Sequence, residues 1–238
     1  MWMLALLLSV LPAADAPPEE ATCLRAATPV RIDGAPNDAA WAEAAMVRDF
    51  RLLDSFDAPD SETVLRLCYD DRYLYALFEC TDEDVFTLHS DRDAPLWEAD
   101  VVQLCLEPTP LLEREAPIYY VFQVAPDNTI FDARLVNSGS GGFRRWAGWA
   151  CGMRTAARVE GAANDWEQRD GGYTVEMAIP LSAFSETIGG EPLTGQTWRF
   201  LGARVDYSVG FERAQHSATG KVRHSLHERA GYSTLHFK

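Results

Sequence analysis

The sequence predicts an all-β protein, an antiparallel two-sheet β-sandwich of jelly-roll-like order with one or two short helices. Three observations carry this prediction. In most segments apolar and polar residues alternate with a period of two, which is the side-chain period of a strand. Turn residues such as Asp, Asn, Pro and Gly separate these segments, and helical periodicity is scarce. Many short strands joined by turns are typical of sandwiches and jelly rolls.

The N-terminal segment has two parts. Residues 2–11 are mostly apolar, and Ala14 and Ala16 provide a small-x-small cleavage site, so we expect residues 1–16 to be a secretory signal peptide. The apolar run is too short to cross the ~30 Å hydrocarbon core, so we expect no membrane span in the mature chain. We expect residues 17–27 to form an extended, mobile leader before a single domain over 28–238. The expected location is therefore secreted or periplasmic.

Helix signals are confined to two places. Residues 38–45 begin with an acidic residue and continue with good helix formers, which predicts a short helix. Residues 181–184 suit a single helical turn, because Pro180 ends the strand before them.

The strands follow in order along the chain. Two hairpins are expected, at 63–80 around a turn at 70–72 and at 119–135 around a turn at 126–128. Further strands are expected within 149–160, 197–207 and 232–238. The most regular alternation lies within 171–181, where one apolar face is formed by Tyr173, Val175, Met177 and Ile179. Trp41, Tyr173 and Trp198 are assigned to the core, whereas Glu176 faces the other way and is a weaker ligand candidate.

Composition limits the function. The 238 residues are 47% hydrophobic, which suffices for one domain with a sizeable core. The formal net charge of −15 repels phosphate backbones, so nucleic acid is not an expected partner. The five cysteines lack C-x-x-C spacing, which argues against a zinc framework and favours buried, small apolar side chains. The sequence leaves undecided whether two of these cysteines form a disulfide, and it selects no pair.

No motif selects a catalytic function. The sequence contains no P-loop, dinucleotide fingerprint or G-x-S-x-G motif. A glycosidase needs two carboxylates about 5–5.5 Å or 6.5–9.5 Å apart, and no signature selects a pair from the acidic residues. We therefore expect a non-catalytic domain.

Five segments stand in an order that resembles the family 9 carbohydrate-binding modules and related secreted domains. They are VRIDGAPNDAAW (30–41), LCYDDRYLYALFECTDED (67–84), PLWEADVVQLCLEP (95–108), YYVFQVAPDNTIFDAR (119–134) and DGGYTVEMAIPLSAF (170–184). The resemblance covers residues 28–238. It implies a sandwich of two antiparallel sheets, bound calcium, and binding of glucans, xylans or soluble sugars. Such modules usually accompany glycoside hydrolases, so the resemblance also implies a role in polysaccharide catabolism beside such enzymes.

The resemblance places Trp97 at the family's first sugar-stacking tryptophan. The apolar C–H face of a pyranose ring stacks on an aromatic ring, and its hydroxyls need donors and acceptors. Gln103 falls where some members have a hydroxyl-binding glutamate, and Gln123 falls near a family arginine. Either amide would bond a hydroxyl more weakly than a charged group. The alternative for Trp97 is packing beneath the neighbouring loop.

The family's second stacking tryptophan has no counterpart here. The equivalent region contains Leu226, and the adjacent His227 is the expected replacement, since a histidine can stack on a sugar or bond a hydroxyl. Trp146 is a further candidate for an aromatic wall. Its neighbour Trp149 and the nearby His224 are expected to be core and surface residues, respectively.

A possible calcium site is expected from acidic residues around the third segment. The candidates are Asp82, Asp84, Asp91, Asp93 and Asp100. Calcium takes six to eight oxygen ligands from carboxylates and carbonyls. The spacing lacks the D-x-D-x-D-G pattern of a dedicated loop, so the alternative is a solvated acidic edge.

Two other functions stay open from the sequence. Related sandwiches carry haem in secreted redox proteins, and Met46, Met153, Met177 and His89 are candidate axial ligands by residue type. Met177 also fits the core. The other alternative is a degenerate domain that contacts proteins.

Overall fold

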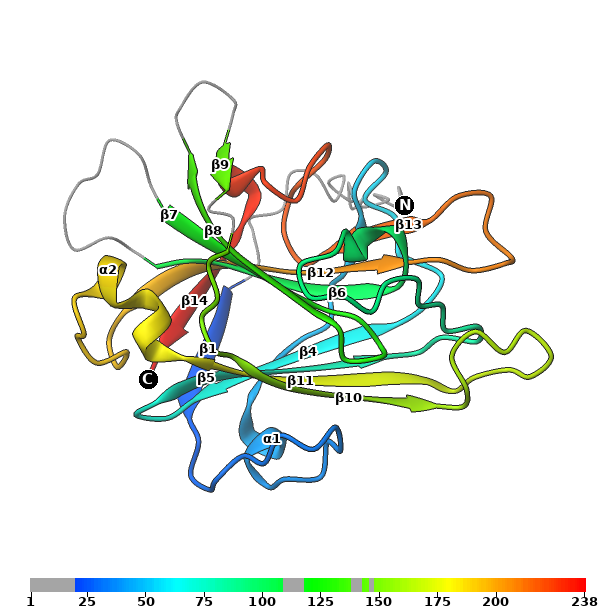
Figure 1. The fold of residues 1–238 in the computed structure, drawn as a ribbon. Coiled ribbons are helices and arrows are strands. Elements are labelled where there is room, and N and C mark those ends of the chain that lie inside the picture. Colours follow the sequence, from blue (N-terminus) through cyan, green and yellow to red (C-terminus); the bar gives the residue numbers. More distant parts are fainter. Residues whose placement is uncertain (1–19, 109–117, 138–142, 146–147) are drawn as a thin grey trace, which may run out of the picture.

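The structure is a computed structural model that describes residues 20–108, 118–137, 143–145 and 148–238. Within these residues the strands form two stacked layers (Figure 1). Within these ranges the secondary structure is mostly strand, so the all-β prediction is confirmed. The signal peptide predicted at 1–16 lies outside the described residues.

In the upper layer of Figure 1, each strand in the series that runs from β14 to β9 pairs antiparallel with the next one. Its order is β14-β12-β6-β7-β8-β9, with β13 beside β12 and β3 beside β13. The strands are β3 (Arg51–Leu52), β6 (Val101–Glu107), β7 (Ile118–Val124), β8 (Ile130–Asn137), β9 (Phe143–Arg145), β12 (Thr197–Asp206), β13 (Gln215–Ala218) and β14 (Ser233–Phe237).

The lower layer has the order β10-β11-β5-β4, with β2 paired to β4, and is also antiparallel. The strands are β2 (Ala45–Val47), β4 (Thr63–Tyr69), β5 (Tyr73–Cys80), β10 (Arg154–Glu160) and β11 (Gly172–Pro180). Both predicted hairpins are present, as β4–β5 and β7–β8.

The N-terminal strand β1 (Glu20–Arg25) corrects two expectations. It pairs in parallel with β14 and with β4, so it links the layers into one continuous, curled sheet rather than two wholly antiparallel ones. Residues 20–25 are therefore part of the domain and not a mobile leader. Cys23 has no exposed surface, which is consistent with a strand at the seam between the layers.

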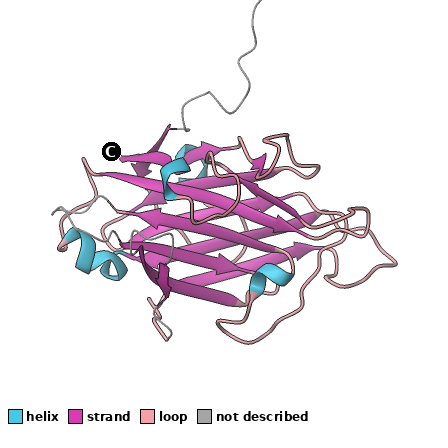
Figure 2. Ribbon diagram, turned by 90° about the horizontal axis from the view of Figure 1, so that it is seen from above, coloured by secondary structure: helices cyan, strands magenta, loops and turns pink. Residues whose placement is uncertain are grey.

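Helical segments are short and lie in the connections between strands (Figure 2). They are α1 (Ala40–Glu43), η2 (Leu96–Glu98), η3 (Leu181–Phe184), α2 (Ser185–Ile188) and η4 (Arg229–Gly231). The two predicted helical segments correspond to α1 and η3. Among the described residues, no helix is long and apolar enough to cross a membrane.

The main hydrophobic core fills the space between the layers. It contains Tyr173, Val175, Met177 and Ile179, the predicted apolar face of β11. Aromatic rings pack together at its centre, where the rings of Trp198 and Phe184 meet edge-to-face at a centroid distance of 4.9 Å. Trp149 packs against this core as predicted. All five cysteines are free thiols, which answers the open question of a disulfide.

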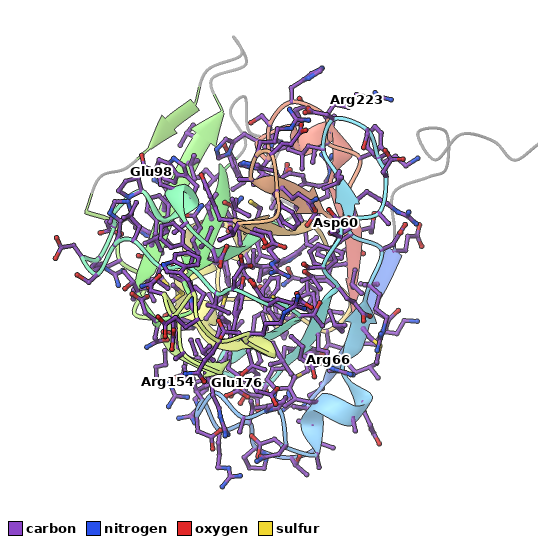
Figure 3. All side chains as sticks on the ribbon, turned by 90° about the vertical axis from the view of Figure 1, so that its right-hand side faces the viewer. Asp60, Arg66, Glu98, Arg154, Glu176 and Arg223 are labelled. Atoms are coloured by element: carbon purple, nitrogen blue, oxygen red, sulfur yellow. The ribbon has the colours of Figure 1, made fainter. Side chains whose placement is uncertain are left out.

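Glu176 holds the N-terminal segment of the domain against the outer face of the lower layer. Its carboxylate accepts hydrogen bonds from the backbone N–H groups of Asp33 and Gly34, at 2.9 and 2.8 Å, and from Trp41 Nε1 at 3.0 Å. Gly34 has a φ of +81°, which suits glycine at this turn. Figure 3 shows Glu176 on the same side of the molecule as α1. Glu176 therefore has a structural role.

Candidate functional site

The outer face of the upper layer brings three of the predicted site residues together. Antiparallel register places Gln103 on β6 opposite Gln123 on β7, and Gln123 opposite Phe131 on β8. Cross-strand neighbours of this kind share one face of a sheet. Phe131 in turn contacts Trp97, so the four side chains form a row across the sheet, here called the Trp97 row.

The two glutamines of the row are bonded to one another. Gln123 Nε2 donates to Gln103 Oε1 at 2.6 Å, and Gln103 Nε2 donates to Cys105 Sγ at 3.0 Å. Both residues are buried, with Gln103 4% exposed and Gln123 5% exposed. Gln123 Oε1 has no hydrogen-bond partner within the described part of the chain. A buried carbonyl oxygen without a partner is uncommon in folded proteins, and it leaves an acceptor available at this position.

Trp97 lies at the surface. It belongs to η2, whose neighbouring residue Leu96 is buried and anchors the turn to the sheet. Trp97 itself is 43% exposed, and its ring meets Phe131 edge-to-face at a centroid distance of 6.2 Å. The Trp97 carbonyl oxygen accepts a hydrogen bond from the hydroxyl of Tyr207 at 3.3 Å. The ring is thus supported on one edge and retains surface in contact with water.

His227 lies on the same outer face but against a different part of β7. Its Nδ1 is 3.1 Å from the hydroxyl of Tyr119, and the two rings pack edge-to-face. Burial lowers the pKa of the His227 imidazole, which favours the neutral form. Leu226 packs against the same face, and its carbonyl oxygen accepts a hydrogen bond from Tyr232. The structure therefore places His227 against Tyr119. Trp146 lies outside the described residues.

Three carboxylates converge beneath the loops that follow β5 and β12. Asp82, Asp100 and Asp206 are buried, and each offers an oxygen within 4.8 Å of the others. The buried Arg204 donates to Asp82 at 2.7 Å and lies 3.2 Å from Asp206. Asp206 was not among the sequence candidates, although Asp82 and Asp100 were.

Electrostatics leave this carboxylate cluster short of positive charge. Burial raises the pKa of Asp82, Asp100 and Asp206, because removal from water penalises the charged form. Asp206 Oδ1 has no hydrogen-bond partner within the described residues. With one guanidinium among three carboxylates, the raised pKa values favour a proton on the cluster, and the all-oxygen donor set also fits a hard divalent cation such as calcium in its place.

The other acidic candidates lie outside the cluster. Asp84 is its neighbour and accepts the backbone N–H of Val209 at 2.7 Å. Asp91 is exposed, and Asp93 is 3.6 Å from Arg92 and bonds through its backbone N–H to Ile130. The five-residue set is therefore corrected, because the fold brings Asp206 to Asp82 and Asp100 in place of Asp91 and Asp93.

The candidate haem ligands occupy separate environments. Met177 and Met153 are in the interlayer core, and Met46 is exposed on β2 with its sulfur accepting from Arg48. His89 Nε2 pairs with Glu98 at 2.9 Å.

Comparison with known proteins identifies relatives of this fold. The family described as "Carbohydrate family 9 binding domain-like" matches residues 32–225. A search of curated proteins found no match. Among solved structures, a Bacteroides uniformis ATCC 8492 protein provisionally assigned as carbohydrate-binding is 15% identical, with a TM-score of 0.69, and the match covers 93% of this chain and 100% of that one.

Two further solved structures are family 9 carbohydrate-binding modules from Caldicellulosiruptor kristjanssonii. The one in complex with cellotriose is 17% identical, with a TM-score of 0.60, covering 92% of this chain and 94% of that one. The one in complex with glucose is 16% identical, with a TM-score of 0.57, covering 91% and 95%. At these identities the likeness shows the fold. The family match spans most of the chain, so this protein belongs to the carbohydrate family 9 binding domain-like family.

Proposed function

We propose that the domain binds a poly- or oligosaccharide of the glucan or xylan type and does not cleave it. The observation that carries this proposal is the half-exposed ring of Trp97 at one end of the Trp97 row. The two glutamines of that row lie on an otherwise apolar sheet face. The ligand class is supported by the modules of this family that were solved with cellotriose and glucose.

Stacking on Trp97 is the primary contact in this proposal. A pyranose ring can lie on the exposed indole surface without any rearrangement of the protein. Gln103 and Gln123 are buried, so hydroxyl contact with them requires their side chains to change rotamer. The unpartnered Gln123 Oε1 would then accept a hydroxyl proton. A neutral amide pair in this acidic chain suits a neutral sugar.

Replacing Trp97 with alanine tests this role. Binding on a glycan array of gluco- and xylo-oligosaccharides should be lost, while the thermal midpoint stays within a few degrees because the ring is partly solvated. Met46→Ala is the matched control, since Met46 is similarly exposed but lies on β2 of the lower layer. Unchanged glycan binding by the Trp97 variant would defeat the assignment.

The biological setting is part of the proposal. The signal-peptide pattern at 1–16 supports secretion or export to the periplasm, where such a domain would act beside glycoside hydrolases in polysaccharide catabolism. Mass spectrometry of the exported protein should give a mature N-terminus at or near Pro17. An intact N-terminus on all of the protein would contradict export through a cleaved signal.

We also propose that the carboxylate cluster holds calcium. Asp82, Asp100 and Asp206 would supply oxygen ligands, and the ion would neutralise the charge that Arg204 leaves uncompensated. The ion would thereby fix the loops that follow β5 and β12. Its contribution would be structural.

The calcium proposal is tested by thermal unfolding in calcium and in a chelator. Saturating calcium should raise the midpoint of the wild type, because an ion that binds only the folded state stabilises it. Asp206→Asn should remove most of this rise, and Asp91→Asn, which alters a carboxylate outside the cluster, should preserve it. Equal midpoints of the wild type in calcium and in chelator would exclude the site.

A further inference from the structure

An aromatic cavity lies at the end of the sandwich where three long connections meet. It has a volume of about 320 Å³, and its walls include Phe86, Trp166, Tyr207, Val209, Phe211 and Arg213. These residues come from the β5–β6, β10–β11 and β12–β13 connections, which lie toward the right-hand end of the molecule in Figure 1. The volume is at the lower end of the range for small-molecule sites, which suits one or two sugar units.

The aromatic side chains form a continuous wall that is open to water. Trp166 is 57% exposed, and its ring centroid is 5.9 Å from that of Phe86, with the ring planes 37° apart. Phe86 in turn is 6.1 Å from Tyr207. A solvated tryptophan beside two further rings is unusual for a monomer surface and typical of a ligand-binding surface.

The walls of the cavity are held in place by the carboxylates below them. Asp100 accepts the backbone N–H groups of Phe86 and Tyr207, each at 2.7 Å. Asp84 accepts the backbone N–H of Val209 at 2.7 Å and the hydroxyl of Ser208 at 3.0 Å. The arrangement therefore ties two of the three connections together. Preorganisation of this kind reduces the entropy lost on binding.

The third connection is tied to the first by a reciprocal pair. Asn164 Oδ1 accepts the backbone N–H of Thr87 at 2.9 Å, and Asn164 Nδ2 donates to the Thr87 hydroxyl at 3.0 Å. The backbone N–H of Asn164 also bonds to the carbonyl oxygen of Val85 at 2.9 Å. These contacts fix the base of the loop that carries Trp166.

The cavity adjoins the Trp97 row. The hydroxyl of Tyr207, a cavity residue, donates to the carbonyl oxygen of Trp97, so the two surfaces share an edge. The rim offers Arg213 and the Ser208 hydroxyl as hydrogen-bonding groups. Arg213 is 3.3 Å from Asp54, and an acidic chain of net charge −15 disfavours an anionic ligand. Aromatic faces with neutral and paired polar groups suit an uncharged sugar.

We infer that this cavity is a second contact site for the same saccharide chain, with Trp166 as its stacking surface, so that the domain binds oligosaccharides more tightly than single sugars. The inference rests on the proposed function, because it extends the ligand held on Trp97.

Calorimetric titration of the full chain with sugars of increasing length tests the inference. The probes are glucose and cellohexaose, with xylose and xylohexaose in parallel. In the wild type the hexasaccharide should bind more tightly than the monosaccharide. Trp166→Ala should reduce that ratio of affinities by roughly three- to tenfold, which is the size expected for one lost aromatic contact. Trp166→Tyr should restore part of the ratio, because it keeps a stacking ring.

The matched control is Glu167→Ala, an exposed neighbour in the same loop, which should keep the wild-type ratio. A second measurement needs no variant: hydroxyl-radical labelling of the wild type should show protection of Trp166 by the hexasaccharide. If Trp97→Ala abolishes binding but Trp166→Ala leaves the ratio unchanged and Trp166 is not protected, this inference is wrong and the proposed function stands. If the wild type binds none of the probes, both are wrong.

Discussion

Two tryptophans lie on opposite outer faces of the sandwich and differ in how much of their surface is exposed to water. On the lower layer Trp41 is 2% exposed and donates its indole N–H to Glu176. On the upper layer Trp97 is 43% exposed and lies at one end of the Trp97 row, in contact with Phe131. Figure 3 shows the two faces, with Glu176 on the side of α1 and Glu98, next to Trp97, on the opposite side.

The difference lies in hydrogen-bond saturation. Glu176 accepts three hydrogen bonds from one segment of the chain, so both of its oxygens are occupied. Gln123 keeps an oxygen without a partner among the described residues. The saturated carboxylate beside the buried ring stabilises the fold, whereas the unsaturated amide oxygen of Gln123 is the one that our proposal assigns to a sugar hydroxyl.

The largest expected effect comes from Trp41→Ala. The substitution removes a fully packed ring from the cluster beneath the N-terminal segment and should lower the free energy of unfolding by about 3–5 kcal/mol. Urea denaturation followed by fluorescence measures it. Trp97→Ala should cost less than about 1 kcal/mol in the same assay, because its ring is partly solvated. Equal losses in the two variants would break the comparison between the faces.

A smaller loss of about 2 kcal/mol is expected for Glu176→Gln. The neutral amide keeps the shape of the side chain but replaces one acceptor oxygen with an NH₂ group, which faces donors from Asp33, Gly34 or Trp41. Chemical denaturation gives the loss, and Glu167→Gln on an exposed loop is the control. Wild-type stability in the Glu176 variant would show that the carboxylate does not hold this segment.

Much of the fold could be predicted from sequence because strand periodicity is a local property. The alternation in β11 assigned Tyr173 and Met177 to the core, where both are found. By contrast, β1 has little alternation, and its place is set by pairing with β14 and β4, which lie far from it in the sequence. No local pattern in residues 20–25 indicates those partners.

The candidate site was harder to predict because it is assembled from distant segments. Trp97, Gln103 and Gln123 were found through a family resemblance, and cross-strand register explains why they meet. Asp206 and Arg204 alternate normally within β12, so nothing local marks them as buried charges. Phe86, Trp166 and Tyr207 come from three connections, and only the tertiary structure brings them together.

Gln123→Leu tests the unsaturated side of the comparison. The change should lower the free energy of unfolding by about 1 kcal/mol, because it removes an unpartnered buried oxygen but leaves the buried Gln103 Oε1 without its donor. Affinity for the sugar that we propose to stack on Trp97 should fall by roughly three- to tenfold, the value of one neutral hydrogen bond. A large loss of stability with unchanged affinity would place Gln123 with Glu176 as a structural group.

The smallest expected effect is a pH dependence from His227, at the Tyr119 end of the upper face. Burial lowers the pKa of this imidazole below its ordinary value of 6.5, so the unfolded chain binds a proton more readily than the folded one. The groups around it include the Tyr119 hydroxyl, with Arg229 and Glu107 paired nearby. Its contribution to stability should therefore be present above pH 6.5 and be lost as the pH falls below it.

The measurement is urea denaturation of the wild type and His227→Gln at a series of pH values from 7.5 to about 5, around the ordinary pKa of histidine. The wild type should lose stability more steeply below pH 6.5 than the variant, since only the wild type must hold a neutral imidazole in the fold. His224→Gln is the matched control, because this histidine is exposed in the same loop, and it should follow the wild type. Parallel curves for the wild type and His227→Gln would mean that His227 is solvated, and the upper face would then be open at the Tyr119 end as well as at Trp97.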